Sequence, residues 1–289
     1  MLAPRGGGDA GAAAGDLGFA PGQVLDGPRD LGLRAAVVGR RVHYLASVDS
    51  TNAALRALAD AGAAEGTVLL ADGQTAGRGR AGRAWFSPPG LGLWLSVLLR
   101  PGRPPREMGA LSVATALSVA GALRQSCGVD ARVKWPNDVV AGGGRKLGGV
   151  LLESLQGAGG TIERMVVGIG LNVNIEPGDL PPDLAGTATS LRMLLGRPVS
   201  RLDALRAVLS MFDADWRLFE ADGLGGFRSR WLDLSTTLGR RVEIAQGAGV
   251  VRGVAVGLSD AGALIVETDE GERREIWHGD VTAQGGPDD

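Results

Sequence analysis

The stretch from Leu93 to Leu99 constrains the fold of this chain more than any other segment. It reads Leu-Trp-Leu-Ser-Val-Leu-Leu and is apolar almost without interruption, which is typical of a central β-strand. Residues 107–127 are apolar on nearly every side, which indicates a helix buried against the sheet. We therefore expect an α+β fold with a mixed central sheet and helices.

Other segments extend this pattern. The group Ser50-Thr51-Asn52 precedes apolar residues at helical spacing and predicts a capped helix that ends at Gly62. Apolar positions from Leu202 to Phe219, with Ser200 as N-cap, predict a long amphipathic helix. Further strands are expected at residues 67–71, 132–135, 146–154 and 163–173.

After about residue 238 the pattern changes to short strands separated by turns. Strands are expected at 241–245, 250–256, 263–266 and 274–277, which predicts a small antiparallel β-barrel of about 45 residues. We expect a Gly/Ala-rich flexible tail over residues 1–36, a main domain over 37–237, the barrel over 238–283 and a short tail over 284–289.

Composition excludes several classes of protein. Thirty basic and 32 acidic residues give a net charge of −2, so no global field favours nucleic acid or an anionic membrane. A single cysteine, Cys127, allows no internal disulfide, and His43 and His278 are the only histidines. No apolar run approaches the ~20 residues that span a bilayer. We expect a cytoplasmic protein with no DNA or membrane partner.

The basic residues are almost all arginine. Only Lys134 and Lys146 are lysines, and they lie close together in the sequence. An ammonium group is a compact point charge and differs chemically from the planar guanidinium. We take the pair as an indicator of a functional segment.

A glycine–arginine loop, residues 77–83, reads Gly-Arg-Gly-Arg-Ala-Gly-Arg. It contains the spacing G-x-G-x-x-G, but Pro88-Pro89 follow closely and stop the helix that a dinucleotide fingerprint requires. Glycines that allow close approach and the guanidinium groups of Arg78, Arg80 and Arg83 favour an anion-binding loop. An ordinary solvated loop and an RGG-like nucleic-acid tether are the alternatives.

The lysine segments also carry polar groups. Lys134, Asn137 and Asp138 share a strand end and a Pro-Asn turn, although such a turn needs no function to explain it. Lys146 precedes Gly148 and Gly149, and glycines in a strand let a ligand lie against bare backbone. By the same reasoning, the strand glycines Gly168 and Gly170 leave space next to Asn172.

These segments, in this order, resemble the biotin protein ligase family. The matching elements, which span about residues 42–280, are Asp49-Ser50-Thr51-Asn52, residues 74–83 with Trp85-Phe86-Ser87, Lys134-Trp135-Pro136-Asn137-Asp138, residues 145–151 and residues 168–174. The resemblance implies a ligase core similar to class II aminoacyl-tRNA synthetases and an SH3-like C-terminal barrel. It also implies ATP and Mg²⁺ as cofactors and biotin as substrate.

The implied reaction has two steps. Biotin and ATP form biotinyl-5′-AMP and pyrophosphate, and a lysine of a biotin carboxyl carrier domain, such as that of acetyl-CoA carboxylase, then accepts the biotinyl group. Both steps call for positioning and charge stabilisation rather than a protein nucleophile. We further expect a monomer or a weak ligand-dependent homodimer. Because residues 1–36 do not read as a DNA-binding domain, we expect no transcriptional repression.

The resemblance also implies roles for individual residues. The catalytic set is Lys146, Arg80 and Asp138, with Asp138 also serving Mg²⁺. The biotin-binding set is Ser50, Thr51, Asn52, Gln74, Arg78, Gly79, Arg80, Lys146, Gly148 and Gly149. The set that binds ATP or the adenylate is Arg78, Arg80, Arg83, Trp85, Lys134, Asn137 and Asn172.

Three alternatives remain open. A lipoate-type ligase shares this fold and chemistry, although the polar group Ser50-Thr51-Asn52 suits a ureido ring better than an apolar dithiolane. A nucleic-acid-binding module would use the glycine–arginine loop, and its affinity would fall steeply with salt. A biotin sensor without catalysis is disfavoured by the presence of both lysines.

Overall fold

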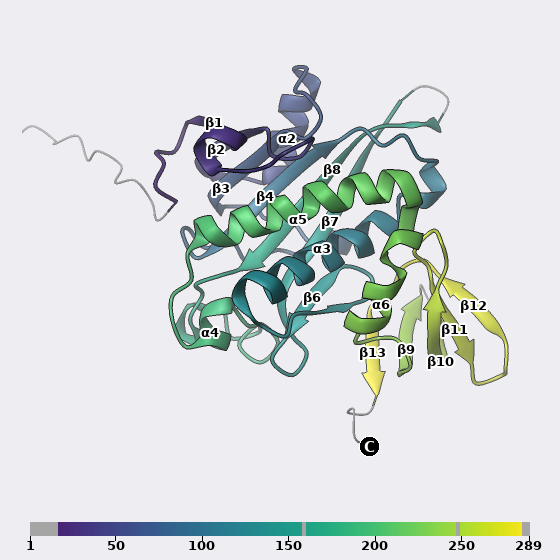
Figure 1. The fold of residues 1–289 in the computed structure, drawn as a ribbon. Helices are drawn as coiled ribbons and strands as arrows, with labels where there is room; N and C mark the ends of the chain where they lie inside the picture. The colour runs from purple at the N-terminus through teal and green to yellow at the C-terminus, as the bar shows by residue number, and fades with distance from the viewer. Residues whose placement is uncertain (1–16, 158–159, 247–248, 285–289) are drawn as a thin grey trace, which may run out of the picture.

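The computed structural model describes residues 17–157, 160–246 and 249–284. These residues form an eight-stranded sheet with helices and a separate five-stranded sheet near the C-terminus (Figure 1). Within the described residues, no helix combines the length and the apolar character needed to cross a membrane.

The large sheet has the strand order β1-β2-β3-β4-β8-β7-β6-β5. Only β2 and β3 run parallel, and all other neighbours are antiparallel. The strands are β1 (Val24–Asp26), β2 (Arg41–Val48), β3 (Val68–Gln74), β4 (Gly92–Leu99), β5 (Arg132–Lys134), β6 (Asp138–Ala141), β7 (Arg145–Gln156) and β8 (Ile162–Asn172).

The apolar run that predicted a central strand is β4. Every residue of β4 is buried, and the strand pairs with β3 on one side and β8 on the other. The two longest strands, β7 and β8, pair along almost their full length. The expected mixed central sheet is therefore confirmed.

Helices cover both faces of this sheet (Figure 1). Helices α3 (Ala110–Cys127), α5 (Arg201–Asp222) and α6 (Arg228–Leu234) lie on one face, and α3 contacts both α5 and the strands β5, β6 and β7. Helix α2 (Thr51–Asp60) contacts β3, β4 and β8, and its Leu55 is buried with Leu69, Leu98 and Val166 in a separate small core. The short helix α4 (Leu191–Leu195) follows a loop after β8.

The long helix α5 begins where its cap predicts. The Ser200 side chain accepts a hydrogen bond from the Asp203 backbone N–H at 3.1 Å, which satisfies one of the otherwise unpaired donors of the first turn. The predicted stripe, including Leu205, Leu209 and Phe212, is buried against the core.

The expectation of a flexible tail through residue 36 is wrong for residues 17–36. Strand β1 pairs with β2, helix α1 (Gly27–Leu31) follows it, and Leu25 and Leu31 are buried. The buried carboxylate of Asp213 also accepts hydrogen bonds from the backbone of residues 36–38. Apolar residues scattered among glycines give no readable period, because this segment is held by contacts with distant residues. Residues 1–16 lie outside the described residues.

The second sheet is antiparallel throughout, with the order β12-β11-β10-β9-β13. Its strands are β9 (Arg241–Gln246), β10 (Gly249–Leu258), β11 (Leu264–Thr268), β12 (Arg273–Ile276) and β13 (Val281–Gln284). The pairs among the described residues leave β12 and β13 at the two edges, so closure into a barrel stays a prediction. Strand β13 was not predicted, and residues 285–289 lie outside the described residues.

Candidate active site

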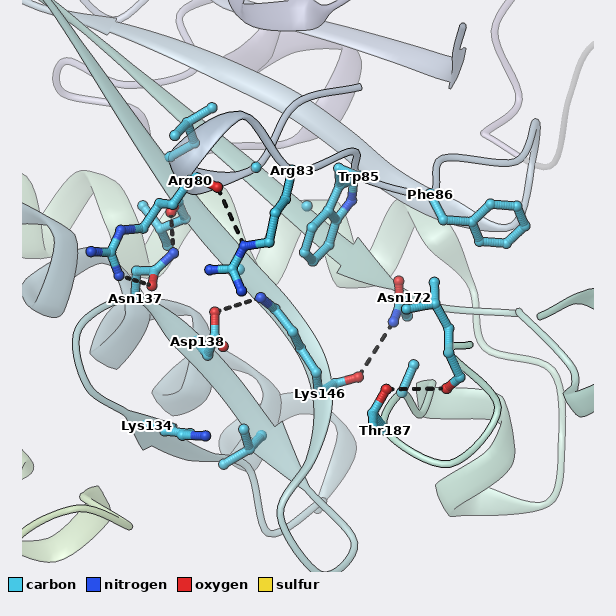
Figure 2. Close-up of a pocket in the computed structure, with 18 of the residues that line it drawn as sticks. Arg80, Arg83, Trp85, Phe86, Lys134, Asn137, Asp138, Lys146, Asn172 and Thr187 are labelled. Carbon is cyan, nitrogen blue, oxygen red and sulfur yellow. Dashed lines mark hydrogen bonds and ion pairs between the residues drawn. The ribbon is translucent and has the colours of Figure 1, made fainter. Parts of the chain in front are cut away.

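A cavity of about 640 Å³ opens on the face of the large sheet that also carries α2. Its walls come from β7 and β8, the start of α2, the glycine–arginine loop, the turn between β5 and β6, the segment before α4, and the residues leading into β13. The volume lies within the range of about 300–1,000 Å³ that is usual for small-molecule sites. Figure 2 shows the cationic and amide side chains that converge there.

The glycine–arginine loop forms a small hairpin. Arg78 and Ala84 make an antiparallel bridge, the Gly79 N–H donates to the Arg83 carbonyl at 2.7 Å, and the Arg83 N–H donates to the Arg80 carbonyl at 3.2 Å. The tip is formed by Ala81 and Gly82, both with positive φ (54° and 73°). A type I′ hairpin turn requires positive φ at both of its central residues. This geometry places Arg80 and Arg83 in the cavity wall.

Arg80 is held by the turn that follows β5. Its Nη1 donates to Asn137 Oδ1 at 3.1 Å, and the Asn137 Nδ2 donates to the Val150 carbonyl at 2.7 Å (Figure 2). Burial lowers the pKa of Arg80, although the nearby carboxylates of Asp138 and Asp280 act in the opposite direction. Arg80 has no direct carboxylate partner among the described residues, and a half-buried guanidinium in that state favours an incoming anion.

Lys146 lines the cavity and lies close to both Asp138 and Trp85. Its Nζ is 2.6 Å from Asp138 Oδ1 and 5.1 Å from the centroid of the Trp85 ring. Its backbone is fixed by the loop before α4, because the Lys146 N–H donates to the Thr187 carbonyl at 2.7 Å. The ammonium group is therefore oriented by an anion on one side and an aromatic face on the other.

A polar pocket surrounds the N-terminus of α2. The Gln74 Oε1 accepts from the Thr51 N–H at 2.8 Å and from the Thr51 hydroxyl at 3.1 Å, and the Gln74 Nε2 donates to Ser87 Oγ at 2.8 Å. Asn52 is 3% exposed, yet its Nδ2 has no hydrogen-bond partner among the described residues. A buried amide donor without a partner costs free energy unless a ligand supplies an acceptor.

The strand glycines line the cavity and also leave room for two side chains of the protein. An added Cβ would lie 2.5 Å from the Trp85 indole at Gly170, 3.2 Å from the same indole at Gly149, and 2.4 Å from Asn52 Oδ1 at Gly168. Gly149, Gly168 and Gly170 nevertheless line the cavity, so contact between a ligand and their backbone stays a prediction. The glycines make room for Trp85 and Asn52, and these side chains face the cavity.

Nearly all predicted site residues line this one cavity. They are Ser50, Thr51, Asn52, Gln74, Arg78, Gly79, Arg80, Arg83, Trp85, Lys134, Asn137, Asp138, Lys146, Gly149 and Asn172. Gly148 does not line the cavity, because alternate residues of a strand face opposite sides, and a Cβ there would meet the Gly170 carbonyl and Leu171. In Figure 2, Lys134 lies away from the other labelled cationic groups, whereas Asn172 lies near Lys146, whose carbonyl accepts from the Asn172 Nδ2 at 3.5 Å.

Several lining residues were not predicted. The loop before α4 contributes Leu180, Leu184 and Thr187, and the segment before β13 contributes Asp280. The Asp280 carboxylate accepts from Arg83 Nη2 at 2.9 Å, although both side chains are largely exposed. Neither segment carries a sequence motif, so these residues could not be predicted. The second sheet comes next to the site only when the chain folds.

The side chains present are compatible with Mg²⁺ bound together with a nucleotide. Asp138 is a carboxylate in the cavity next to the cationic groups, whereas the described residues contain no group of three or more metal-binding side chains. Magnesium usually binds to one or two carboxylates plus phosphate oxygens and water, rather than to an all-protein cage. The donor set therefore fits a metal that arrives with its phosphate ligands.

Two protein-family models match this chain, one in each of its two sheets. A model of the biotin/lipoate A/B protein ligase family matches residues 44–172, and a model of the biotin protein ligase C-terminal domain matches residues 237–282. A biotin protein ligase from Aquifex aeolicus, solved in complex with biotin and ATP, aligns with a TM-score of 0.73 and 33% identity over 85% of this chain and 99% of that chain.

Two relatives of similar sequence agree with this assignment. The biotin–[acetyl-CoA-carboxylase] ligase of Paracoccus denitrificans is 35% identical over 79% of this chain and 95% of its own length. The bifunctional ligase/repressor BirA of Bacillus subtilis is 32% identical over 90% of this chain and 79% of its own length. The chain belongs to the biotin/lipoate A/B protein ligase family.

Proposed function

We propose that this protein activates biotin with ATP and transfers the biotinyl group to a lysine of a carrier domain of an acyl-CoA carboxylase. The observation that supports the proposal is that one cavity contains both a polar pocket and a cationic group. A polar pocket at α2 lies next to a cationic group made by Arg80 and Lys146. Such a cavity suits the joining of a neutral polar ring system to a phosphate through a carboxylate.

In the first step, an oxygen of the biotin carboxylate attacks the α-phosphorus of ATP, the bond to the β-phosphate breaks, and pyrophosphate leaves. Lys146 and Arg80 offset the negative charge of the carboxylate and the phosphate in the transition state, which is the most effective role for fixed charges in a closed site. Asp138 keeps the Lys146 ammonium in place at 2.6 Å. Asp138 would hold Mg²⁺ together with the phosphates of ATP, and the bound ion would supply positive charge for the phosphate oxygens.

In the second step, the amine of the carrier lysine attacks the carbonyl of the mixed anhydride, AMP leaves, and the amine loses its proton. The indole of Trp85, packed over Gly149 and Gly170, offers a flat surface for the adenine of the adenylate. A closed adenylate pocket also excludes water, which would otherwise hydrolyse the anhydride.

Biotin is favoured over lipoate by the unpartnered Asn52 amide. The carbonyl of a ureido ring can accept a hydrogen bond from the buried Nδ2, whereas a dithiolane would leave that donor unpaired. A site with buried polar groups rejects a substrate that cannot pair with them. Lipoate is therefore the second candidate and not the first.

Isotope exchange between pyrophosphate and ATP tests the proposal directly. The purified protein with Mg²⁺ is assayed with biotin, with lipoate and without an acid. We expect exchange that depends on biotin. Exchange with lipoate alone would assign the lipoate reaction instead, and no exchange with either acid would contradict adenylate formation altogether.

A further inference from the structure

Glu153 lies next to the cavity, on the same face of β7 as Gly149 and Leu151. Its side chain is 19% exposed, and its Oε2 has no hydrogen-bond partner among the described residues. A carboxylate in such surroundings needs nearby positive charge, because partial burial removes much of the water that would stabilise it. Neither step of the proposed reaction uses Glu153.

Two arginines from different elements share this carboxylate. Arg78 Nη2 of the glycine–arginine loop lies 3.5 Å from Oε1, and Arg56 Nη1 of α2 lies 3.8 Å from Oε2. Both distances exceed the range of about 2.7–2.9 Å for charge-assisted hydrogen bonds. Both arginines are about half exposed, so each pair is loose enough to separate when a stronger anion arrives.

We propose that Glu153 is the shared counter-ion of Arg78 and Arg56, and that Arg56 compensates the Glu153 charge when Arg78 turns to an anionic ligand. This inference rests on the proposed function, because the anion is the phosphate of the adenylate. It assigns Arg56 an influence on ligand binding although Arg56 does not line the cavity.

The coupling has a simple electrostatic origin. If Arg78 were the sole partner of Glu153, its departure would leave a partly buried carboxylate without a counter-charge, and ligand binding would bear that cost. Arg56 removes most of the cost, because it stays close to the second oxygen. Its effect on the ligand must therefore pass through Glu153.

A double-mutant cycle on the full-length protein tests this dependence. The dissociation constant of biotinyl-5′-adenylate is measured by titration for the wild type, Arg56→Gln, Glu153→Gln and the double variant. We expect Arg56→Gln to weaken binding about fivefold, which corresponds to about 1 kcal/mol. Glu153→Gln should not weaken binding, and in that background Arg56→Gln should have no further effect.

Matched variants make the result specific. Arg56→Lys keeps the charge and should restore wild-type affinity. Arg40→Gln removes an equal charge from an exposed position outside the cavity and should leave affinity unchanged. If Glu153→Gln does not fold, Glu153→Thr supplies the neutral background for the same comparison.

Two outcomes would overturn the inference. An equal loss from Arg56→Gln in both backgrounds would show that Arg56 acts independently of Glu153. Wild-type affinity in Arg56→Gln alone would show that Arg56 does not act at all. In both cases the wild type still binds the adenylate, so the proposed function stands, whereas a wild type that binds no adenylate would overturn the function together with the inference.

Discussion

At the scale of single residues, the cavity is shaped by positions where a side chain is missing. Gly170 is the tightest contact with the Trp85 indole, since an added Cβ would lie 2.5 Å from it. We predict that Gly170→Ala pushes Trp85 out of place, costs about 1–3 kcal/mol of stability and weakens binding of the adenine end. Titration with ATP and thermal unfolding measure the two effects.

Alanine at two other glycines should weaken ATP binding less than alanine at Gly170 does. At Gly149 the Cβ would lie 3.2 Å from the indole, so Gly149→Ala should weaken ATP binding less than Gly170→Ala does. Gly178→Ala meets no atom within 4 Å and should behave as the wild type. If all three variants bound ATP equally well, Trp85 would not form part of the nucleotide site.

Lys146 is the residue whose loss should affect chemistry more than binding. Lys146→Ala removes the charge that offsets the reacting carboxylate and phosphate, and leaves the polar pocket at Gln74 intact. We predict that pyrophosphate–ATP exchange falls by about 10²–10³, while the dissociation constant of biotin changes little. Calorimetric titration measures the latter. Near-normal exchange in Lys146→Ala would remove Lys146 from the catalytic step.

Some of the residues in the site could be predicted from the sequence, and others could not. Arg80, Asn137 and Lys146 lie in short segments whose residue types already point to anions, and they converge in the fold. Thr187 and Asp280 could not be found, because a backbone carbonyl that accepts from Lys146 and a carboxylate from a separate sheet leave no local pattern. Gly148 and Gly149 are adjacent in sequence, and only the strand's alternation decides which one faces the cavity.

At the scale of elements, the hairpin of the glycine–arginine loop depends on its tip. Ala81 has a φ of 54°, a conformation that is particularly unfavourable for β-branched residues. We predict that Ala81→Val opens the hairpin and accelerates hydrogen exchange at the amides of Gly79 and Arg83, which close it. Affinity for the adenylate should fall with it, because Arg80 and Arg83 lose their fixed positions.

Ala81→Gly is the control for this hairpin. Glycine adopts positive φ without the steric cost of a side chain, so hydrogen exchange at Gly79 and Arg83 should stay as slow as in the wild type. Equal exchange rates in Ala81→Val and the wild type would show that the tip does not determine the order of the loop.

Prediction of elements succeeded where burial leaves a regular pattern over many residues, either a continuous apolar run or a helical period. Strand β4 and helix α5 are recognised because each is buried in a regular way along its length. Strand β1 has three residues and helix α1 has five, which is too short for a period. Strand β1 depends on pairing with β2, and α1 on contacts with distant residues, such as Arg206 Nε, which donates to the Leu31 carbonyl at 2.8 Å.

At the scale of the whole molecule, the second sheet packs against the segment that leads into the active site. The Trp135 Nε1 donates to the Gly262 carbonyl at 3.0 Å, and Trp135 directly precedes the turn that carries Asn137 and Asp138. Arg83 and Asp280 add an exposed ion pair between the glycine–arginine loop and the second sheet. The C-terminal sheet therefore supports the cavity wall that is formed by the turn between β5 and β6.

Gly262 is the position where this packing can be tested. Its Cβ would lie 2.6 Å from Ala110 Cα, and backbone at the start of α3 cannot move away as a flexible side chain can. We predict that Gly262→Ala separates the two sheets, lowers stability by about 1–3 kcal/mol and reduces biotin-dependent pyrophosphate exchange, because the turn after Trp135 loses its support. Differential scanning calorimetry should show the two sheets unfolding in separate transitions.

Gly271→Ala separates the packing effect from backbone strain. Gly271 has nearly the same φ as Gly262 (82° against 88°), lies in another turn of the second sheet, and has no atom within 4 Å of an added Cβ. It should therefore show only the cost of an alanine at positive φ, with one unfolding transition and normal exchange. If both variants behaved alike, strain within the second sheet would explain the loss, and contact between the sheets would not be what holds the turn of Asn137 and Asp138 in place.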